Sequence, residues 1–62
     1  MQEQTSILVD DVWVSRTDPA FEVTVIHQSD LYVTFVEHAR GLAKDTLKRG
    51  EFLARYQLSK RS

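Results

Sequence analysis

The residues that could carry acid–base or metal chemistry are few, and their spacing does not bring them together. Asp10 and Asp11 are adjacent, and neighbouring side chains on an extended strand point to opposite faces, so these two carboxylates cannot easily share a proton. His27 and His38 fall on opposite faces of the hairpin that we predict below. There is no cysteine, and two histidines alone make a poor metal cage. The sequence therefore predicts neither a catalytic carboxylate pair nor a metal site.

Motifs that hold phosphates or activate a nucleophile are not found either. The chain contains no GxGxxG or GxxxxGKS/T loop, no GxSxG elbow and no HExxH pattern. A domain of 62 residues also offers little concavity from which water could be excluded. We therefore expect no enzymatic activity and no cofactor, and a protein that acts by binding.

The charges are divided unevenly along the chain. The formal net charge is -1, yet residues 1–39 hold seven acidic side chains against Arg16 alone. Residues 40–62 hold seven basic side chains against Asp45 and Glu51. A basic C-terminal third could meet phosphates or an acidic partner. The simpler interpretation is that the acidic and basic segments lie beside one another in the fold and neutralise each other locally.

Residues 21–36 form the segment around which the fold is organised. Two runs rich in β-branched and aromatic residues flank a polar stretch at residues 28–30, a pattern typical of a β-hairpin. The apolar rows of the two strands reach the same face only if the loop has an odd number of residues. We expect a three-residue loop with Asp30 in the left-handed region. The predicted cross-strand pairs are Val25 with Val33 and Val23 with Phe35.

Before the hairpin, residues 12–15 are predicted as the first strand, and Trp13 as a core anchor because of its large apolar area. Residues 16–20 are predicted as a turn, in which Asp18 suits the first position and Pro19 fixes φ.

Two predictions compete for the segment that follows Gly41. Helix propensity favours helices over residues 42–48 and 51–56, packed as a C-terminal helical segment on a three-stranded meander, an α+β fold. Alternatively, residues 42–47 form a fourth strand, residues 51–55 a helical turn and residues 56–58 a short closing strand. The second arrangement covers edges that three strands would leave exposed.

A resemblance favours the second arrangement. Asp11, Val12 and Trp13, a hairpin of β-branched residues, a glycine turn and the closing segment EFLARY follow one another over about residues 10–58. This order resembles small SH3-like barrel proteins of unknown function that are found in bacteriophage and prophage genomes. The resemblance implies an all-β fold, a small five-stranded SH3-like barrel with a short helical turn before the last strand. It implies no active site.

The phage resemblance and the charge pattern together suggest an accessory module that engages a host protein. An acidic surface would suit a basic site on a host nucleic-acid enzyme, and an apolar patch on the hairpin would add contact area. The candidate protein-binding residues are Asp10, Asp11, Asp18, Glu22, Ile26, Tyr32 and Val36. For the alternative, a nucleic-acid-binding barrel, the candidates are Tyr32, Arg40, Lys44, Lys48, Arg49 and Arg55. The third alternative is a structural homo-oligomer such as a homodimer.

The predicted organisation is one domain over residues 7–58, with a flexible N-terminus over residues 1–6 and a basic tail over residues 59–62. No apolar run approaches the roughly 20 residues of a membrane helix, and the first six residues lack signal-peptide character. We therefore expect no membrane contact and a location in the cytoplasm of a bacterial host cell.

Overall fold

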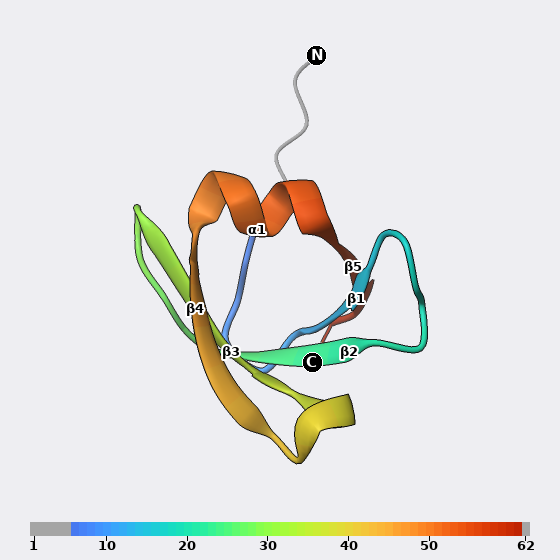
Figure 1. The fold of residues 1–62 in the computed structure, drawn as a ribbon. Helices are drawn as coiled ribbons and strands as arrows, with labels where there is room; N and C mark the ends of the chain where they lie inside the picture. Colours follow the sequence, from blue (N-terminus) through green and yellow to red (C-terminus); the bar gives the residue numbers. More distant parts are fainter. Residues whose placement is uncertain (1–5, 62) are drawn as a thin grey trace.

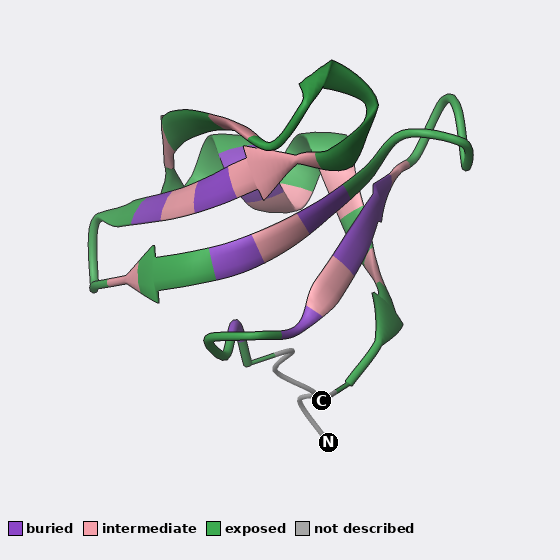
Figure 2. Cartoon of the chain, turned by 90° about the horizontal axis from the view of Figure 1, so that it is seen from below, coloured by how far each residue is buried: buried purple, intermediate pink, exposed green. Residues whose placement is uncertain are grey.

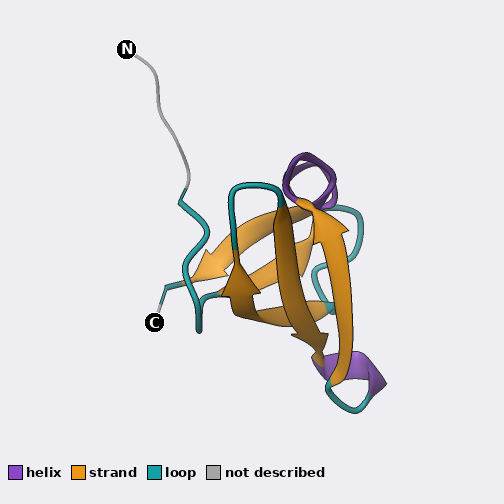
Figure 3. Cartoon of the chain, turned by 90° about the vertical axis from the view of Figure 1, so that its left-hand side faces the viewer, coloured by secondary structure: helices purple, strands orange, loops and turns teal. Residues whose placement is uncertain are grey.

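From residue 6 to residue 61, the part of the chain that the computed structural model describes, five strands form one antiparallel sheet and a short helix precedes the last strand (Figure 1). The elements are β1 (Val12–Ser15), β2 (Glu22–Gln28), β3 (Tyr32–Glu37), the 3₁₀ turn η1 (His38–Arg40), β4 (Ala43–Lys48), α1 (Arg49–Arg55) and β5 (Tyr56–Lys60). The order across the sheet is β4-β3-β2-β1-β5. The turn η1 and the helix α1 lie at opposite ends of β4 (Figure 3).

The strand prediction for the C-terminal part is confirmed, and the alternative of helices over residues 42–48 is wrong. β4 pairs with β3 along its whole length, from Tyr32 with Lys48 to Glu37 with Ala43. Local helix propensity loses here because pairing with β3 satisfies the backbone and leaves Leu47 packed against the core. The sheet is not closed into a barrel, since β4 and β5 are its two separate edges.

The start of β4 and the end of β5 differ from the predicted bounds. Gly41 and Leu42 have φ values of 66° and 63°, so they form the left-handed corner after η1 and the strand begins only at Ala43. β5 continues to Lys60, two residues beyond the predicted end. Part of the predicted basic tail is therefore strand.

The β2–β3 hairpin has a different register from the predicted one. Val25 pairs with Phe35 rather than with Val33, and Val23 pairs with Glu37 rather than with Phe35. Val23, Val25, Val33 and Phe35 are nevertheless all buried. The prediction of one shared apolar face is therefore confirmed, although the cross-strand partners were wrong.

The extra residue that brings both apolar rows to one face lies in strand β2 and not in the loop. The backbone N–H of Ser29 donates to the carbonyl of Tyr32 over 2.8 Å, which leaves a two-residue turn between them. Asp30 in this turn does not have a positive φ. The register shifts by one residue between Val25 and His27, at a β-bulge that contains Ile26. The bulge shifts the alternation of inward and outward side chains by one residue. It therefore brings the apolar side chains of both strands to one face, which is the effect that we expected of a three-residue loop.

Aromatic rings fill the space between the concave face of the sheet and α1. Phe52 is fully buried, and its ring centroid lies 5.1 Å from that of Trp13, 5.3 Å from that of Phe35 and 5.0 Å from that of Tyr56. The predicted role of Trp13 as a core anchor is confirmed. The core cluster is Ile7, Trp13, Val23, Val25, Val33, Phe35 and Phe52. Buried and less buried positions alternate along the first halves of β2 and β3, as strands with one core-facing side require (Figure 2).

The two ends of the described chain are held together by Arg61. Its Nε lies 3.1 Å from Oδ2 of Asp11, and its Nη2 donates to the carbonyl of Ser6 over 2.8 Å. Asp11 is 1% exposed, and a buried carboxylate is stable only where charge and hydrogen bonds compensate its lost hydration. Residues 1–5 of the predicted flexible N-terminus, and residue 62 of the tail, lie outside the described residues.

Replacing Phe52 by alanine should lower the free energy of unfolding by about 3–5 kcal/mol, since the change removes a ring that is in contact with three other rings. Urea denaturation followed by far-ultraviolet circular dichroism measures the loss. Leu31→Ala is the matched control, because Leu31 is 69% exposed. Equal effects of the two substitutions would contradict the assignment of α1 to the core.

Replacing Arg61 by alanine should lower the thermal midpoint through a loss of about 1–2 kcal/mol, because the carboxylate of Asp11 stays buried without this cation. The expected loss is less than for a fully buried pair, since the side chain of Arg61 is 41% exposed and partly screened. Lys60→Ala, at an exposed position of β5, should change stability by no more than about 0.5 kcal/mol. An Arg61 variant as stable as this control would mean that the ion pair does not form in solution.

Candidate functional site

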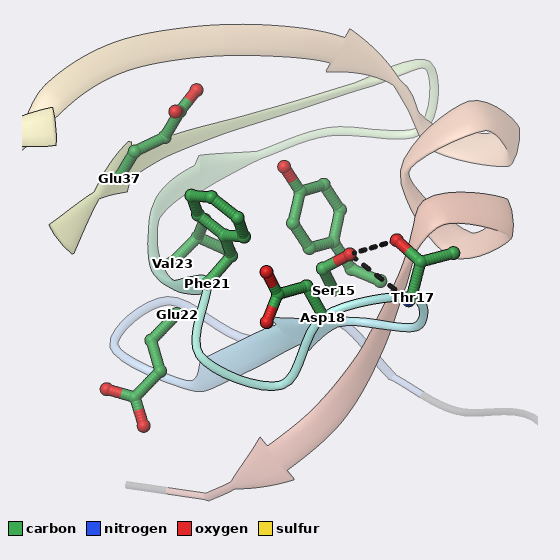
Figure 4. Close-up of a pocket in the computed structure, with 8 residues that line it drawn as sticks. Ser15, Thr17, Asp18, Phe21, Glu22, Val23 and Glu37 are labelled. Carbon is green, nitrogen blue, oxygen red and sulfur yellow. Dashed lines mark hydrogen bonds between the residues drawn. The ribbon is translucent and has the colours of Figure 1, made fainter. Parts of the chain in front are cut away.

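An open pocket of about 490 Å³ lies beside the β1–β2 loop, where the core-facing side of the sheet meets solvent (Figure 4). Two aromatic rings, Phe21 and Tyr56, contribute to its wall. Its polar lining includes the carboxylates of Asp18 and Glu37 and the hydroxyls of Ser15 and Thr17, and Val23 and Glu22 complete it. The pocket therefore combines apolar ring surface with negative charge.

The β1–β2 loop is shaped by hydrogen bonds that Asp18 makes to the backbone. Oδ1 of Asp18 accepts a hydrogen bond from the backbone N–H of Ala20 over 3.1 Å, and its carbonyl accepts one from Phe21 over 3.0 Å. The backbone N–H of Ser15 donates to the carbonyl of Phe21 over 3.0 Å, closing the loop. The predicted turn at residues 16–20 is confirmed. Its geometry leaves Phe21 47% exposed at the pocket.

Arg16 connects this loop to the C-terminal part of α1. Its Nε and Nη2 donate to the carbonyl of Leu53 over 3.1 and 3.0 Å, and its backbone N–H donates to the carbonyl of Arg55 over 2.9 Å. The loop side of the pocket is therefore fixed relative to Tyr56, which directly follows the helix.

Glu37 is a pocket residue that the sequence-based candidates did not include. It lies at the end of β3, on the same side of the strand as Val33 and Phe35, and its side chain is only 16% exposed. Nη1 of Arg40 lies 3.6 Å from its Oε1. The two-residue alternation of Val33, Phe35 and Glu37 was the signal that could have found it, since it places this carboxylate at the rim of the core.

The pKa of the Tyr56 phenol depends on its burial and on the charges around the pocket. Burial raises the pKa of its phenol above the ordinary value of 10.0, and the carboxylates of Glu37 and Asp45 raise it further, while Arg55 acts in the opposite direction. Among the charges that act on this phenol, that of Glu37 has the largest effect. The pocket lining itself holds carboxylates and no basic side chain, so it favours cations over anions.

The four acidic candidates from the sequence do not form one surface. Asp11 is buried against Arg61, and Asp10 lies at the far end of the β1–β2 pairing, where its backbone N–H donates to the carbonyl of Val25. Asp18 and Glu22 do line the pocket. Figure 4 shows the carboxylate of Glu22 directed away from the other lining side chains, and its Oε1 lies 3.7 Å from Nδ1 of His38.

The apolar candidates lie on the opposite face, together with two lysines. Tyr32 and Val36 occupy alternate outward positions of β3, and their partners on β4 are Lys48 and Lys44. Ile26 lies in the bulge of the neighbouring strand β2. The structure therefore does not bring the predicted protein-binding set together: Asp18 and Glu22 belong to the pocket lining, and the apolar candidates lie on the outer face of β2 and β3. Asp10 and Asp11 belong to neither group.

The basic candidates are grouped only in part. Lys44 and Lys48 share the outer face with Tyr32, as described above. Nη1 of Arg49 donates to Oε1 of Gln28 over 3.3 Å, next to the β2–β3 turn. The other two are held elsewhere: Arg40 is beside Glu37, and Arg55 pairs with Glu51 over 3.0 Å on α1.

Within residues 6–61, no group of three or more histidine, aspartate and glutamate side chains could hold a metal ion. None of the helices described is long and apolar enough to cross a membrane. Comparison with known proteins finds no family model, no curated protein and no solved structure that matches this chain.

The raised pKa of Tyr56 gives a direct test of the pocket. In a Tyr32→Phe background, the absorbance of tyrosinate should titrate above pH 10.0 in the folded protein, and Glu37→Gln should shift the titration down, though burial keeps it above the ordinary value. Because the folded pKa is the higher one, the contribution of Tyr56 to stability is complete below pH 10.0 and is lost as the pH rises through the folded value. Asp30→Asn, on the distant β2–β3 turn, is the control. A titration that Glu37→Gln leaves unchanged would show that the two groups do not interact.

Proposed function

We propose that this chain is a non-enzymatic binding module that engages another protein through the pocket beside the β1–β2 loop. The observation that carries the proposal is the exposed ring of Phe21 next to the carboxylates of Asp18 and Glu37 in one concave site. Aromatic side chains are enriched at protein interfaces, and charged rims select and steer the partner. The acidic character of the pocket favours a partner whose surface is basic.

The fold and the origin of the chain belong to the same proposal. Five antiparallel strands and a helical turn directly before the last strand are features that the resemblance to small SH3-like barrels implied. We therefore describe the sheet as an open relative of that barrel, and the chain as a phage or prophage accessory protein. On this proposal it acts in the cytoplasm of a bacterial host and binds a host protein.

Nucleic-acid binding is the second candidate, and one observation favours it. On the outer face, Lys48 lies opposite the exposed Tyr32 and Lys44 lies opposite Val36, and neither lysine has an ion-pair partner among the described residues. An aromatic ring on the same face as unpaired lysines can stack a base while the lysines contact phosphates. The lysines also argue against a homo-oligomer that forms through β4. Lysine on an edge strand opposes pairing of that strand with the same strand of a second copy of the chain.

Affinity capture with nuclease-treated bacterial lysate can separate the two binding candidates. The bait is the full chain, in wild-type form and as the pocket variant Asp18→Asn/Glu37→Gln. We expect the wild type to retain one protein in stoichiometric amount after nuclease treatment, and the pocket variant to lose it, because the variant removes two of the charges that attract the partner.

Two control variants make the comparison specific. Asp30→Asn/Glu51→Gln changes the net charge by the same amount away from the pocket lining, and Lys44→Gln/Lys48→Gln alters only the outer face. Both should retain the partner. Retention of the protein by the pocket variant would contradict the pocket as the binding site. Loss of binding on nuclease treatment together with loss in the lysine variant would replace the proposal by the nucleic-acid alternative.

A further inference from the structure

We infer that Leu42 is an apolar anchor of the binding surface, and that the surface takes a basic amphipathic segment of the partner protein. In this arrangement the cations of the segment face the carboxylates of the pocket, while its apolar side chains contact Leu42 and Phe21. The inference rests on the proposed function and names the kind of partner for the same site.

The backbone at Leu42 is the first observation. Its φ of 63° lies in the left-handed region, which disfavours any residue with a branched or bulky side chain. Glycine would adopt this conformation without strain, and the preceding residue in the same corner is Gly41, with φ 66°. A leucine here costs stability that glycine would not cost.

The side chain of Leu42 is not part of the packed core. It is 60% exposed and does not belong to the core cluster or to the residues packed against it. An exposed leucine in a strained conformation is therefore unexplained by folding. Strained backbone of this kind concentrates at functional positions, where contact with a ligand offsets the cost.

The register of the sheet places the backbone of Leu42 next to Glu37, which lines the pocket. Val23, Glu37 and Ala43 lie in one cross-strand row, and the backbone N–H of Leu42 donates to the carbonyl of Glu37 over 2.9 Å. Phe21 precedes β2 at the same end of the sheet. Because the sheet order is β4-β3-β2, the backbones of Leu42 and Phe21, both with exposed side chains, lie on either side of Glu37.

Charge complementarity selects the partner segment. Asp18 and Glu37 contribute negative charge to the pocket, while the carboxylate of Glu22 is directed away from it, and the lining includes no basic residue. Arg40 already brings a guanidinium to within 3.6 Å of Oε1 of Glu37, from a side chain that is 68% exposed. A cation from the partner can compete for this carboxylate, because the guanidinium of Arg40 is largely exposed and water screens its attraction to Glu37.

The test exploits the opposite effects that Leu42→Gly should have on stability and on binding. The probe is an amphipathic peptide of about 15 residues built from leucine, alanine and lysine, titrated into labelled protein and followed by NMR chemical shifts. We expect shifts around Phe21, Glu37 and Leu42. Leu42→Gly should raise the thermal midpoint by about 2–6 °C through relief of strain, and should weaken peptide binding about tenfold through loss of the buried side chain.

Matched controls decide between the outcomes. Leu31→Gly removes a leucine of similar exposure at the far β2–β3 turn, where φ is not positive, so it should not raise the midpoint and should leave binding unchanged. A peptide of the same composition in scrambled order should bind more weakly to the wild type. Unchanged binding of the amphipathic peptide to Leu42→Gly, or equal binding of the scrambled peptide, would overturn the inference. In either case the proposed function still stands if the pocket variant loses its captured protein.

Discussion

The packing of Phe52 is the interaction on which the rest of this structure depends. The ring is in contact with Trp13 of β1, with Phe35 of β3 and with Tyr56 of β5, so it joins β3 to the neighbouring strands β1 and β5 on the other side of β2. A helix of seven residues has little stability of its own in water. The burial of Phe52 therefore fixes α1, and α1 in turn sets where the last strand begins.

The position of α1 also fixes two parts of the pocket wall. Arg16 donates to the carbonyl of Leu53, which ties the β1–β2 loop to the helix, and Tyr56 is the first residue after it. The hydrogen bonds of Asp18 then hold Phe21 beside the carboxylates. The packing of the core thus determines the geometry of the β1–β2 loop, and the loop determines where the charges of the pocket lie. A substitution at Phe52 would therefore alter the pocket, although Phe52 does not line it.

The elements of this fold could be predicted from the sequence better than their register. The alternation of valines and aromatic residues in residues 21–36 identified the hairpin and its buried face, because burial follows the side-chain period directly. The bulge at Ile26 carries no comparable signal, since a bulge and an odd loop produce the same alternation of apolar side chains. The cross-strand partners, and with them the position of Glu37 opposite Val23, therefore required the structure.

The candidate site could be predicted only in part, for the same physical reason. Asp18 and Glu22 were identified from their charge, but Asp11 looks the same in sequence and is buried against Arg61, from the other end of the chain. Long-range pairs of this kind depend on which strands are neighbours. The strain at Leu42 was equally invisible, because a strand starting at residue 42 has the same apolar pattern as one starting at Ala43.

The most direct measurement of the central packing claim is a two-dimensional nuclear Overhauser spectrum of the full chain. The account predicts cross-peaks from the ring protons of Phe52 to the indole of Trp13 and to the rings of Phe35 and Tyr56. Cross-peaks from Phe52 only to residues of its own helix would contradict the account, because α1 would then not be seated on the sheet and the pocket would lose its fixed wall.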